Sequence, residues 1–179
     1  LSALHFRPIS ALRFAFGNRV LASVSASADR SEVFVSEVAS GRLLFSHAED
    51  CRVLNAVVES NSQSQNWTQS LFLHCEGRLT QLRMMLSEGV YRIFTSSLQL
   101  GRVRELGPAL CLASCAATDD DDGRCVSGHS DGSILFWSGL SFTHKHVKEP
   151  FPIRRLAHNA HVFFCLLDRA KLIVFDLHF

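Results

Sequence analysis

The stretch Gly128-His129-Ser130-Asp131-Gly132-Ser133-Ile134-Leu135-Phe136-Trp137 decides the fold class of this chain. It begins with small residues, passes through an Asp-Gly pair and continues as an apolar run that ends on a large aromatic residue. The pair Asp131-Gly132 predicts a two-residue hairpin turn, because an Asp-Gly pair takes up positive φ angles at low cost. We therefore expect two antiparallel strands joined by a tight turn, with Trp137 at the end of the second strand.

The same pattern, an aspartate in a polar turn followed by a strand, occurs three times in the chain, once in this stretch and once on either side of it. The turn aspartates are Asp29, Asp131 and Asp168, and the strands behind them end at Ser36, Trp137 and Phe175. The spacing of the last two aspartates is close to one structural repeat of about 40 residues, and the longer gap before them leaves room for one degenerate repeat. This periodicity predicts a series of short antiparallel sheets.

These units resemble the inner hairpins of a WD-repeat β-propeller, in which each blade is a four-stranded antiparallel meander. The resemblance assigns structural positions to Ser127 on the first strand, to Asp131 and Gly132 in the turn, and to Trp137 on the second strand. In that family a loop histidine before the blade completes a hydrogen-bonded set with these residues. No histidine stands near Gly107-Pro108, so we expect the set to be incomplete here.

The resemblance implies an all-β fold, a partial WD-repeat propeller of about three to four antiparallel four-stranded blades. As a single unit, 1–179, it divides into approximate blades at 1–50, 51–100 and 101–148, with an incomplete blade at 149–179. Ser36 and Phe175 stand where the family has Trp, so the first blade must close its core differently. Residues 79–86 carry leucines at helical spacing, but the propeller context favours a strand there. Because six or seven blades need a longer chain, we expect a fragment with an open sheet edge.

A narrower resemblance extends over residues 89–165. The run from Gly89–Phe94 through Leu110–Ala113 to the hairpin is similar to the echinoderm microtubule-associated protein-like family. There, too, such a hairpin is followed by an Ala-His pair and an apolar Val-Phe strand, which would be Ala157-His158 and Val162-Phe163 here. The trimerising motif of that family and its adjacent hydrophobic motif are absent from this chain. The resemblance implies a microtubule-associated, cytoskeletal scaffold.

The bulk composition sets limits on the class of protein. The 179 residues are 47% hydrophobic, which is enough for a sizeable core, and the net charge of +1 gives no overall attraction to nucleic acid or anionic membranes. No apolar run reaches the roughly 18 residues of a membrane span. The six cysteines form no Cys-x-x-Cys pair, and we expect buried, reduced thiols on strands in an intracellular, cytoplasmic protein. They are Cys51, Cys75, Cys111, Cys115, Cys125 and Cys165.

No motif in the chain predicts a metal, a cofactor or catalysis. The run Asp119–Asp122 lacks the alternating spacing of a calcium loop. The histidines His144, His146, His158 and His161 have no cysteine or carboxylate at zinc-like spacing. There is no nucleophile elbow, phosphate loop or dinucleotide-binding glycine motif. We therefore expect no metal, no cofactor and no enzymatic activity.

The sequence favours a protein-interaction scaffold, with tubulin or microtubules as the partner under the narrower resemblance. One alternative is a WD-repeat subunit of a nuclear or RNA-processing complex. The basic clusters Lys145–Lys148 and Arg154-Arg155 are either solvated loop charges or contacts to RNA phosphates or an acidic partner. A further alternative is an enzyme built on a propeller. The sequence indicates neither the partner-binding residues nor the oligomeric state.

Overall fold

The computed structural model describes part of the 179-residue chain as four antiparallel sheets. The described residues are 5, 7–58, 67–75, 77–100, 108–114, 124–146, 149–158 and 162–176. In each sheet the strands pair with their neighbours in chain order, so every sheet is a simple meander. The expected all-β architecture is confirmed, because the described residues are almost entirely strands and turns, with a 3₁₀ turn at Asp168–Ala170.

The strand bounds are as follows. Sheet 1 contains β1 (Ile9–Ala15), β2 (Val20–Ala26), β3 (Ser31–Glu37) and β4 (Leu43–Glu49). Sheet 2 contains β5 (Val53–Val58), β6 (Trp67–Cys75), β7 (Arg78–Ser87) and β8 (Val90–Gln99). Sheet 3 contains β9 (Ala109–Ser114), β10 (Arg124–His129), β11 (Ile134–Ser138) and β12 (Ser141–His146). Sheet 4 contains β13 (Ile153–His158), β14 (Val162–Leu167) and β15 (Leu172–Asp176).

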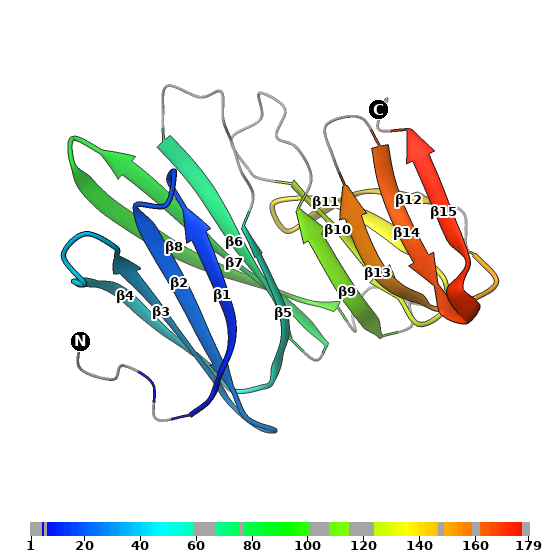
Figure 1. Ribbon diagram of the computed structural model, residues 1–179, viewed down its shortest axis with the longest axis horizontal. Helices are drawn as coiled ribbons and strands as arrows, with labels where there is room; N and C mark the ends of the chain where they lie inside the picture. The colour runs from blue at the N-terminus through cyan, green and yellow to red at the C-terminus, as the bar shows by residue number, and fades with distance from the viewer. Residues whose placement is uncertain are drawn as a thin grey trace.

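The four sheets follow one another in an arc, with the blue sheet 1 and the orange-red sheet 4 at opposite ends (Figure 1). The first strand of each sheet faces the first strand of the next, so that β1 contacts β5, β5 contacts β9, and β9 contacts β13. These inner strands line the concave side of the arc. Each meander then runs outward from its inner strand to its last strand.

Apolar residues with a period of two hold the sheets together. On β3, Val33 and Val35 are fully buried, while Glu32 and Phe34, which alternate with them, are only partly buried. Val33 and Val35 pack with Leu71 from sheet 2 in one cluster. Since successive strand residues point to opposite faces, this alternation buries one face of sheet 1 against its neighbour. Sheet-on-sheet packing of this kind is the main source of stability in the arc.

Several expectations from the sequence are settled by the strand bounds. Residues 79–86 lie within β7 and are strand, as the propeller context predicted. The hairpin turn between β10 and β11 is different from the prediction. His129 N donates to Ser133 O at 2.9 Å, which closes a three-residue loop, and only Gly132 in it has a positive φ.

The described cysteines form no disulfide, and all but one lie where the sequence predicted. Cys75, Cys111, Cys125 and Cys165 are buried on strands. Cys51 is half-buried and lies in the connection from β4 to β5. Cys115 and the run Asp119–Asp122 lie outside the described residues.

The described residues contain no helix with the length and apolar character needed to cross a membrane.

Candidate functional site

The predicted residues Ser127 and Trp137 meet in the interior of sheet 3. Trp137 is 1% exposed, and its Nε1 donates a hydrogen bond of 2.8 Å to Ser127 Oγ. His129 Nε2 lies 2.8 Å from the same oxygen. The sequence analysis expected such a histidine only before the first strand of the sheet, whereas His129 lies within the hairpin itself. The available signal was the two-residue spacing of Ser127 and His129, which puts both side chains on one face of a strand.

The other predicted residues of this hairpin shape its turn. The Asp131 carboxylate accepts hydrogen bonds from the backbone N and the Oγ of Ser133, at 3.1 and 2.9 Å. Gly132 has φ +84°, and a Cβ there would lie 2.8 Å from the carbonyl carbon of Glu149. Glu149 N in turn donates to Gly132 O at 2.9 Å. The turn is therefore packed against the connection that leads into sheet 4.

A histidine closely precedes the first strand of sheet 1, whereas no histidine closely precedes the first strand of sheet 3. His5 precedes β1, and its Nε2 lies 2.7 Å from Ser23 Oγ on β2. The His5 ring also meets the Phe34 ring edge to face, with centroids 4.6 Å apart. Phe34 thus supplies the aromatic contact in a sheet that carries Ser36 at the predicted Trp position. The turn residue Asp29 accepts a hydrogen bond of 3.0 Å from Ser27 Oγ, which lowers its pKa.

In sheet 4 the predicted residues are separated from one another. Asp168 lies in the turn between β14 and β15 and accepts two hydrogen bonds from Arg154 on β13, at 2.5 and 2.9 Å. The hydrogen bond from Arg154 lowers the pKa of Asp168. Phe175 is partly buried against the core between sheets 3 and 4, on the β15 strand. All of these contacts join strands and turns of the fold itself.

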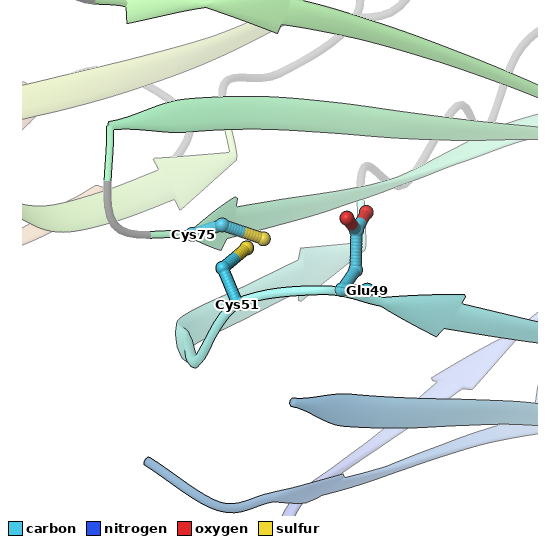
Figure 2. A group of neighbouring side chains, drawn as sticks. All are labelled: Glu49, Cys51 and Cys75. Carbon is cyan, nitrogen blue, oxygen red and sulfur yellow. The ribbon is translucent and has the colours of Figure 1, made fainter. Parts of the chain in front are cut away.

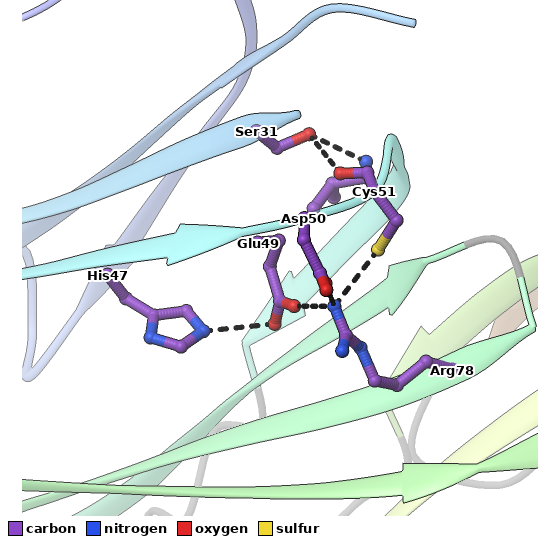
Figure 3. A network of polar contacts seen from close by, with 7 residues as sticks. Ser31, His47, Glu49, Asp50, Cys51 and Arg78 are labelled. Carbon is purple, nitrogen blue, oxygen red and sulfur yellow. Dashed lines mark hydrogen bonds and ion pairs between the residues drawn. The ribbon is translucent and has the colours of Figure 1, made fainter. Parts of the chain in front are cut away.

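A cluster of charged side chains joins sheet 1 to sheet 2 (Figure 3). The guanidinium of Arg78, at the start of β7, contacts the carboxylates of Glu49 and Asp50 and lies 3.2 Å from Cys51 Sγ. His47 Nε2 lies 3.0 Å from the other Glu49 oxygen. Burial alone would raise the pKa of Glu49, but the hydrogen bond from His47 and the charge of Arg78 outweigh it and lower that pKa.

The backbone of this connection is fixed as well. Ser31 Oγ donates to Cys51 O at 3.0 Å and accepts from Val53 N at 2.8 Å. The cluster therefore ties the end of β4, the start of β5 and the β6–β7 turn together. A motif search cannot find an ion pair between residues that are distant in the sequence and lie in different sheets.

Glu49, Cys51 and Cys75 have the ligand types of a metal site (Figure 2). Their ligand atoms all lie within 4.8 Å of one another. However, the Arg78 guanidinium already contacts Glu49 and Cys51 and supplies the positive charge that a metal ion would bring. Burial, followed by the nearby Glu49 carboxylate, raises the pKa of the Cys75 thiol, which opposes the thiolate that a metal requires. We interpret the group as a polar tie between two sheets.

Two further buried thiols are poor nucleophiles. Burial raises the pKa of Cys111 to about 12 and that of Cys165 to about 11. Thiols with such values stay protonated near neutral pH, and the thiolate is the reactive form.

A hollow of about 300 Å³, the inner hollow, opens on the concave side of the arc. It is lined by Leu54, Asn55, Leu110, Cys111, Leu112, Arg154, Arg155 and Leu156. Its polar groups are largely engaged within the fold, since Asn55 Nδ2 donates to Leu112 O at 3.1 Å and Arg154 binds Asp168. The basic pair Arg154-Arg155 is thus on a strand, not in the loop that the sequence suggested.

A larger hollow of about 480 Å³, the turn hollow, lies at the edge of sheets 1 and 2. It is lined by Asn18, Arg19, Glu37, Val38, Ala39, Leu86, Gly89 and Tyr91. These residues come from the β1–β2, β3–β4 and β7–β8 turns and the adjoining strands. Val38 is 47% exposed, and Val90 beside the hollow is 56% exposed, so apolar side chains face solvent here.

The base of the turn hollow is ordered by contacts between the two sheets. The ring of Phe16, which is buried, meets the ring of Tyr91 edge to face with centroids 5.7 Å apart. Phe16 N donates to Gln69 Oε1 of β6 at 2.6 Å. Both sheets therefore contribute contacts around Tyr91, which lines the hollow.

Comparisons with known proteins identify the fold and nothing narrower. No known family matches the sequence, and no curated protein matches it. Among solved structures, the computationally designed Ika4 protein matches with a TM-score of 0.62 and 18% identity, over 97% of this chain and 94% of that one. A chain of the Mitotic Checkpoint Complex matches with a TM-score of 0.57 and 14% identity, over 94% of this chain and 47% of that one.

BamB from Moraxella catarrhalis matches in the same way, with a TM-score of 0.57 and 12% identity, over 96% of this chain and 47% of that one. The chain thus spans about half the length of the last two proteins. All three matched proteins are β-propellers. The four sheets of this chain form a partial β-propeller.

Proposed function

We propose that this protein is a non-catalytic protein-interaction scaffold whose turn hollow receives an apolar side chain of a partner protein. The observation that carries the proposal is the turn hollow itself, in which turns of two sheets surround exposed Val38 on a base fixed by Phe16 and Tyr91. Recognition residues gather on turns that a rigid scaffold positions. Apolar anchors in small hollows dominate the energy of protein interfaces.

The chemistry of the described side chains supports binding over catalysis. The turn aspartates Asp29, Asp131 and Asp168 are each bound to a serine or an arginine of the fold. The thiols of Cys111 and Cys165 are held in the protonated form by burial. In these residues the groups that could act as nucleophile or base are used to hold strands and turns.

Affinity purification of the tagged protein with chemical crosslinking tests the proposal. Recovery of a protein whose crosslinks fall on residues 18–19, 37–39 and 86–91 is the expected result. Crosslinks confined to other parts of the arc would contradict the assignment of the turn hollow, and turnover of a small-molecule substrate by the purified protein would contradict the non-catalytic role.

The narrower form of the proposal is a cytoplasmic, microtubule-associated scaffold. It rests on the resemblance of residues 89–165 to the echinoderm microtubule-associated protein-like family. Sedimentation of the purified protein with polymerised tubulin tests it directly. Saturable recovery in the microtubule pellet is expected, and a protein that stays in the supernatant at all tubulin concentrations removes the microtubule partner while leaving the scaffold.

A second candidate is a subunit of an RNA-containing complex, favoured by the exposed Arg155 on the concave side. Phosphate contacts make affinity fall steeply with salt. Binding to a labelled single-stranded RNA, measured at about 50 and 200 mM salt, distinguishes an RNA-binding subunit from a protein-interaction scaffold. A loss of binding of more than about tenfold over that range indicates an RNA partner, whereas absence of binding at low salt excludes it.

A further inference from the structure

The inner sheets of the arc are covered on both faces. One face of sheet 2 packs on sheet 1 through residues that include Leu71, Leu73 and Leu82. The opposite face of the same strands packs on sheet 3 through Phe72 and Leu79. Sheet 3 continues the series, with Cys111 and Val126 packed against residues of sheet 4. Stacking through apolar faces is thus the rule that joins each sheet to the next.

The outward face of sheet 1 carries exposed apolar side chains, beside the part of the face where His5 packs on Ser23 and Phe34. Leu12 and Phe14 on β1 are 48% and 53% exposed, and they alternate with Ala11 and Ala15, which pack toward sheet 2. Leu43 is 42% exposed and pairs with Ser36. This face has the character of a stacking face that lacks its neighbour.

The outward face of sheet 4 has the same character. Leu166, Leu172 and Val174 are 36%, 57% and 52% exposed, and Leu166 pairs with Leu172. They alternate with Cys165 and Ile173, which pack toward sheet 3. An exposed apolar face of this extent marks a surface for association.

The length of the arc determines what can cover these two faces. The chain covers 47% of the length of each of two propeller chains, so each of those chains is about twice as long as this one. A second copy supplies the missing half, because its sheet 1 can stack on sheet 4 of the first copy and its sheet 4 on sheet 1. This two-fold arrangement buries all four end faces and leaves no face open for further growth.

We propose that two copies of this chain associate head to tail to close a ring, through the sheet 1 face of Leu12, Phe14 and Leu43 and the sheet 4 face of Leu166, Leu172 and Val174. The association continues the sheet-on-sheet packing that already joins sheets 1 to 4. It is independent of the turn hollow, which lies at the edge of sheets 1 and 2.

The test is the molar mass of the purified chain, measured by light scattering during size-exclusion chromatography. The expected mass is twice the 19.9 kDa of one chain. Phe14→Glu and Val174→Lys should each raise the dissociation constant of the dimer by more than about tenfold. Val38→Glu is the matched control, because Val38 is exposed to a similar extent but lies on neither end face, and it should leave the dimer intact.

Mixing the two variants makes the test specific for this geometry. In a mixed dimer, one interface brings the introduced carboxylate of one copy against the introduced ammonium of the other, and the second interface retains both natural faces. The two variants, Phe14→Glu and Val174→Lys, should therefore form a tighter dimer when mixed than either forms alone. Circular dichroism of each variant establishes that it is folded.

Two outcomes would overturn the proposal. A natural chain that runs as a 19.9 kDa monomer shows that the end faces are not covered by a second copy, as when further sheets of a longer polypeptide complete the ring. A dimer that persists in both single variants shows that the copies associate through another surface.

Discussion

Trp137 and Ser127 are both buried in sheet 3. Trp137 is 1% exposed and donates to a serine oxygen that is itself buried. Trp137→Ala removes a large aromatic side chain from a core, which costs about 3–5 kcal/mol of the free energy of unfolding. Ser127→Ala removes only the hydrogen-bond acceptor and should cost about 1–3 kcal/mol. Urea denaturation measures both values.

Ser46→Ala is the control for these variants, because Ser46 is an exposed strand residue and its loss should change the free energy of unfolding by less than about 0.5 kcal/mol. If Trp137→Ala costs well under about 1 kcal/mol, Trp137 lies on the surface and the described packing is wrong.

Arg78 neutralises a buried carboxylate, and its removal should be costly. Glu49 is 3% exposed and loses its guanidinium partner in Arg78→Ala. An uncompensated charge in such a site destabilises by about 3 kcal/mol. The matched control is Arg42→Ala, since Arg42 is 64% exposed and lies 3.8 Å from Glu37; surface pairs of this kind contribute less than about 1 kcal/mol. Equal losses of stability for Arg78→Ala and Arg42→Ala in thermal denaturation would show that the Arg78 cluster does not hold sheets 1 and 2 together.

His74 makes stability depend on pH. It is 2% exposed, and burial, reinforced by nearby His129, lowers its pKa to about 4. The unfolded chain, with an ordinary histidine pKa of about 6.5, binds the proton more tightly than the folded chain. Stability is therefore fully present above about pH 6.5 and falls as the pH drops toward 4, by up to about 3 kcal/mol.

His74→Gln should flatten that part of the profile. The free energy of unfolding of the natural chain and of the variant, measured from pH 4 to 7.5, separates the histidine from the carboxylates, whose contribution remains in both. Parallel profiles for the two proteins would mean that His74 is solvated.

At the scale of the strands, Gly128 allows β10 of sheet 3 to approach β13 of sheet 4. A Cβ at Gly128 would lie 2.7 Å from Ile153 Cβ and 2.8 Å from Cys111 Sγ. Gly128→Ala should destabilise the protein by about 1–3 kcal/mol through overpacking. In the double variant with Ile153→Ala, the combined loss should be smaller than the sum of the single losses by about 1 kcal/mol, because the two sites contact each other.

Gly77 serves as the comparison for this cycle, because a Cβ there meets no atom within 4 Å. Gly77→Ala combined with Ile153→Ala should be additive within about 0.5 kcal/mol. Additivity in the Gly128 cycle as well would contradict the close packing of sheets 3 and 4.

The strands were predictable where their signals are local. The Asp-Gly turn and the apolar run to Trp137 predicted β10 and β11. The loop size of the hairpin was not predictable from Asp131-Gly132, since the backbone pairing of His129 with Ser133 sets it. Leucine spacing over 79–86 suggested a helix, and pairing of β7 on both edges overrides that preference.

The contacts between sheets were not predictable, because they join residues distant in the sequence. Arg78 meets Glu49 only after sheets 1 and 2 have stacked, and no motif spans that separation. The turn hollow likewise arises from three turns whose sequences are individually ordinary.

In the whole molecule, the residues that stabilise the arc of four sheets differ from those that we propose bind a partner. The apolar stacking faces and the polar tie at Arg78 hold the sheets together, and the turns at one edge of sheets 1 and 2 surround an exposed apolar hollow. A change at the rim of that hollow should thus alter binding without altering the fold. A change on the concave side should leave that binding unchanged, because the polar groups of the inner hollow are engaged within the fold.

The dissociation constant of the protein partner, measured by calorimetry for the natural chain, Val38→Glu and Leu54→Glu, tests this account most directly. Val38 lines the turn hollow and Leu54 the inner hollow, and the two are 47% and 48% exposed. Val38→Glu should weaken binding by more than about tenfold, which is about 1.4 kcal/mol, and Leu54→Glu by less than about twofold. Undiminished binding by Val38→Glu, with or without a loss in Leu54→Glu, would contradict the turn hollow as the recognition surface.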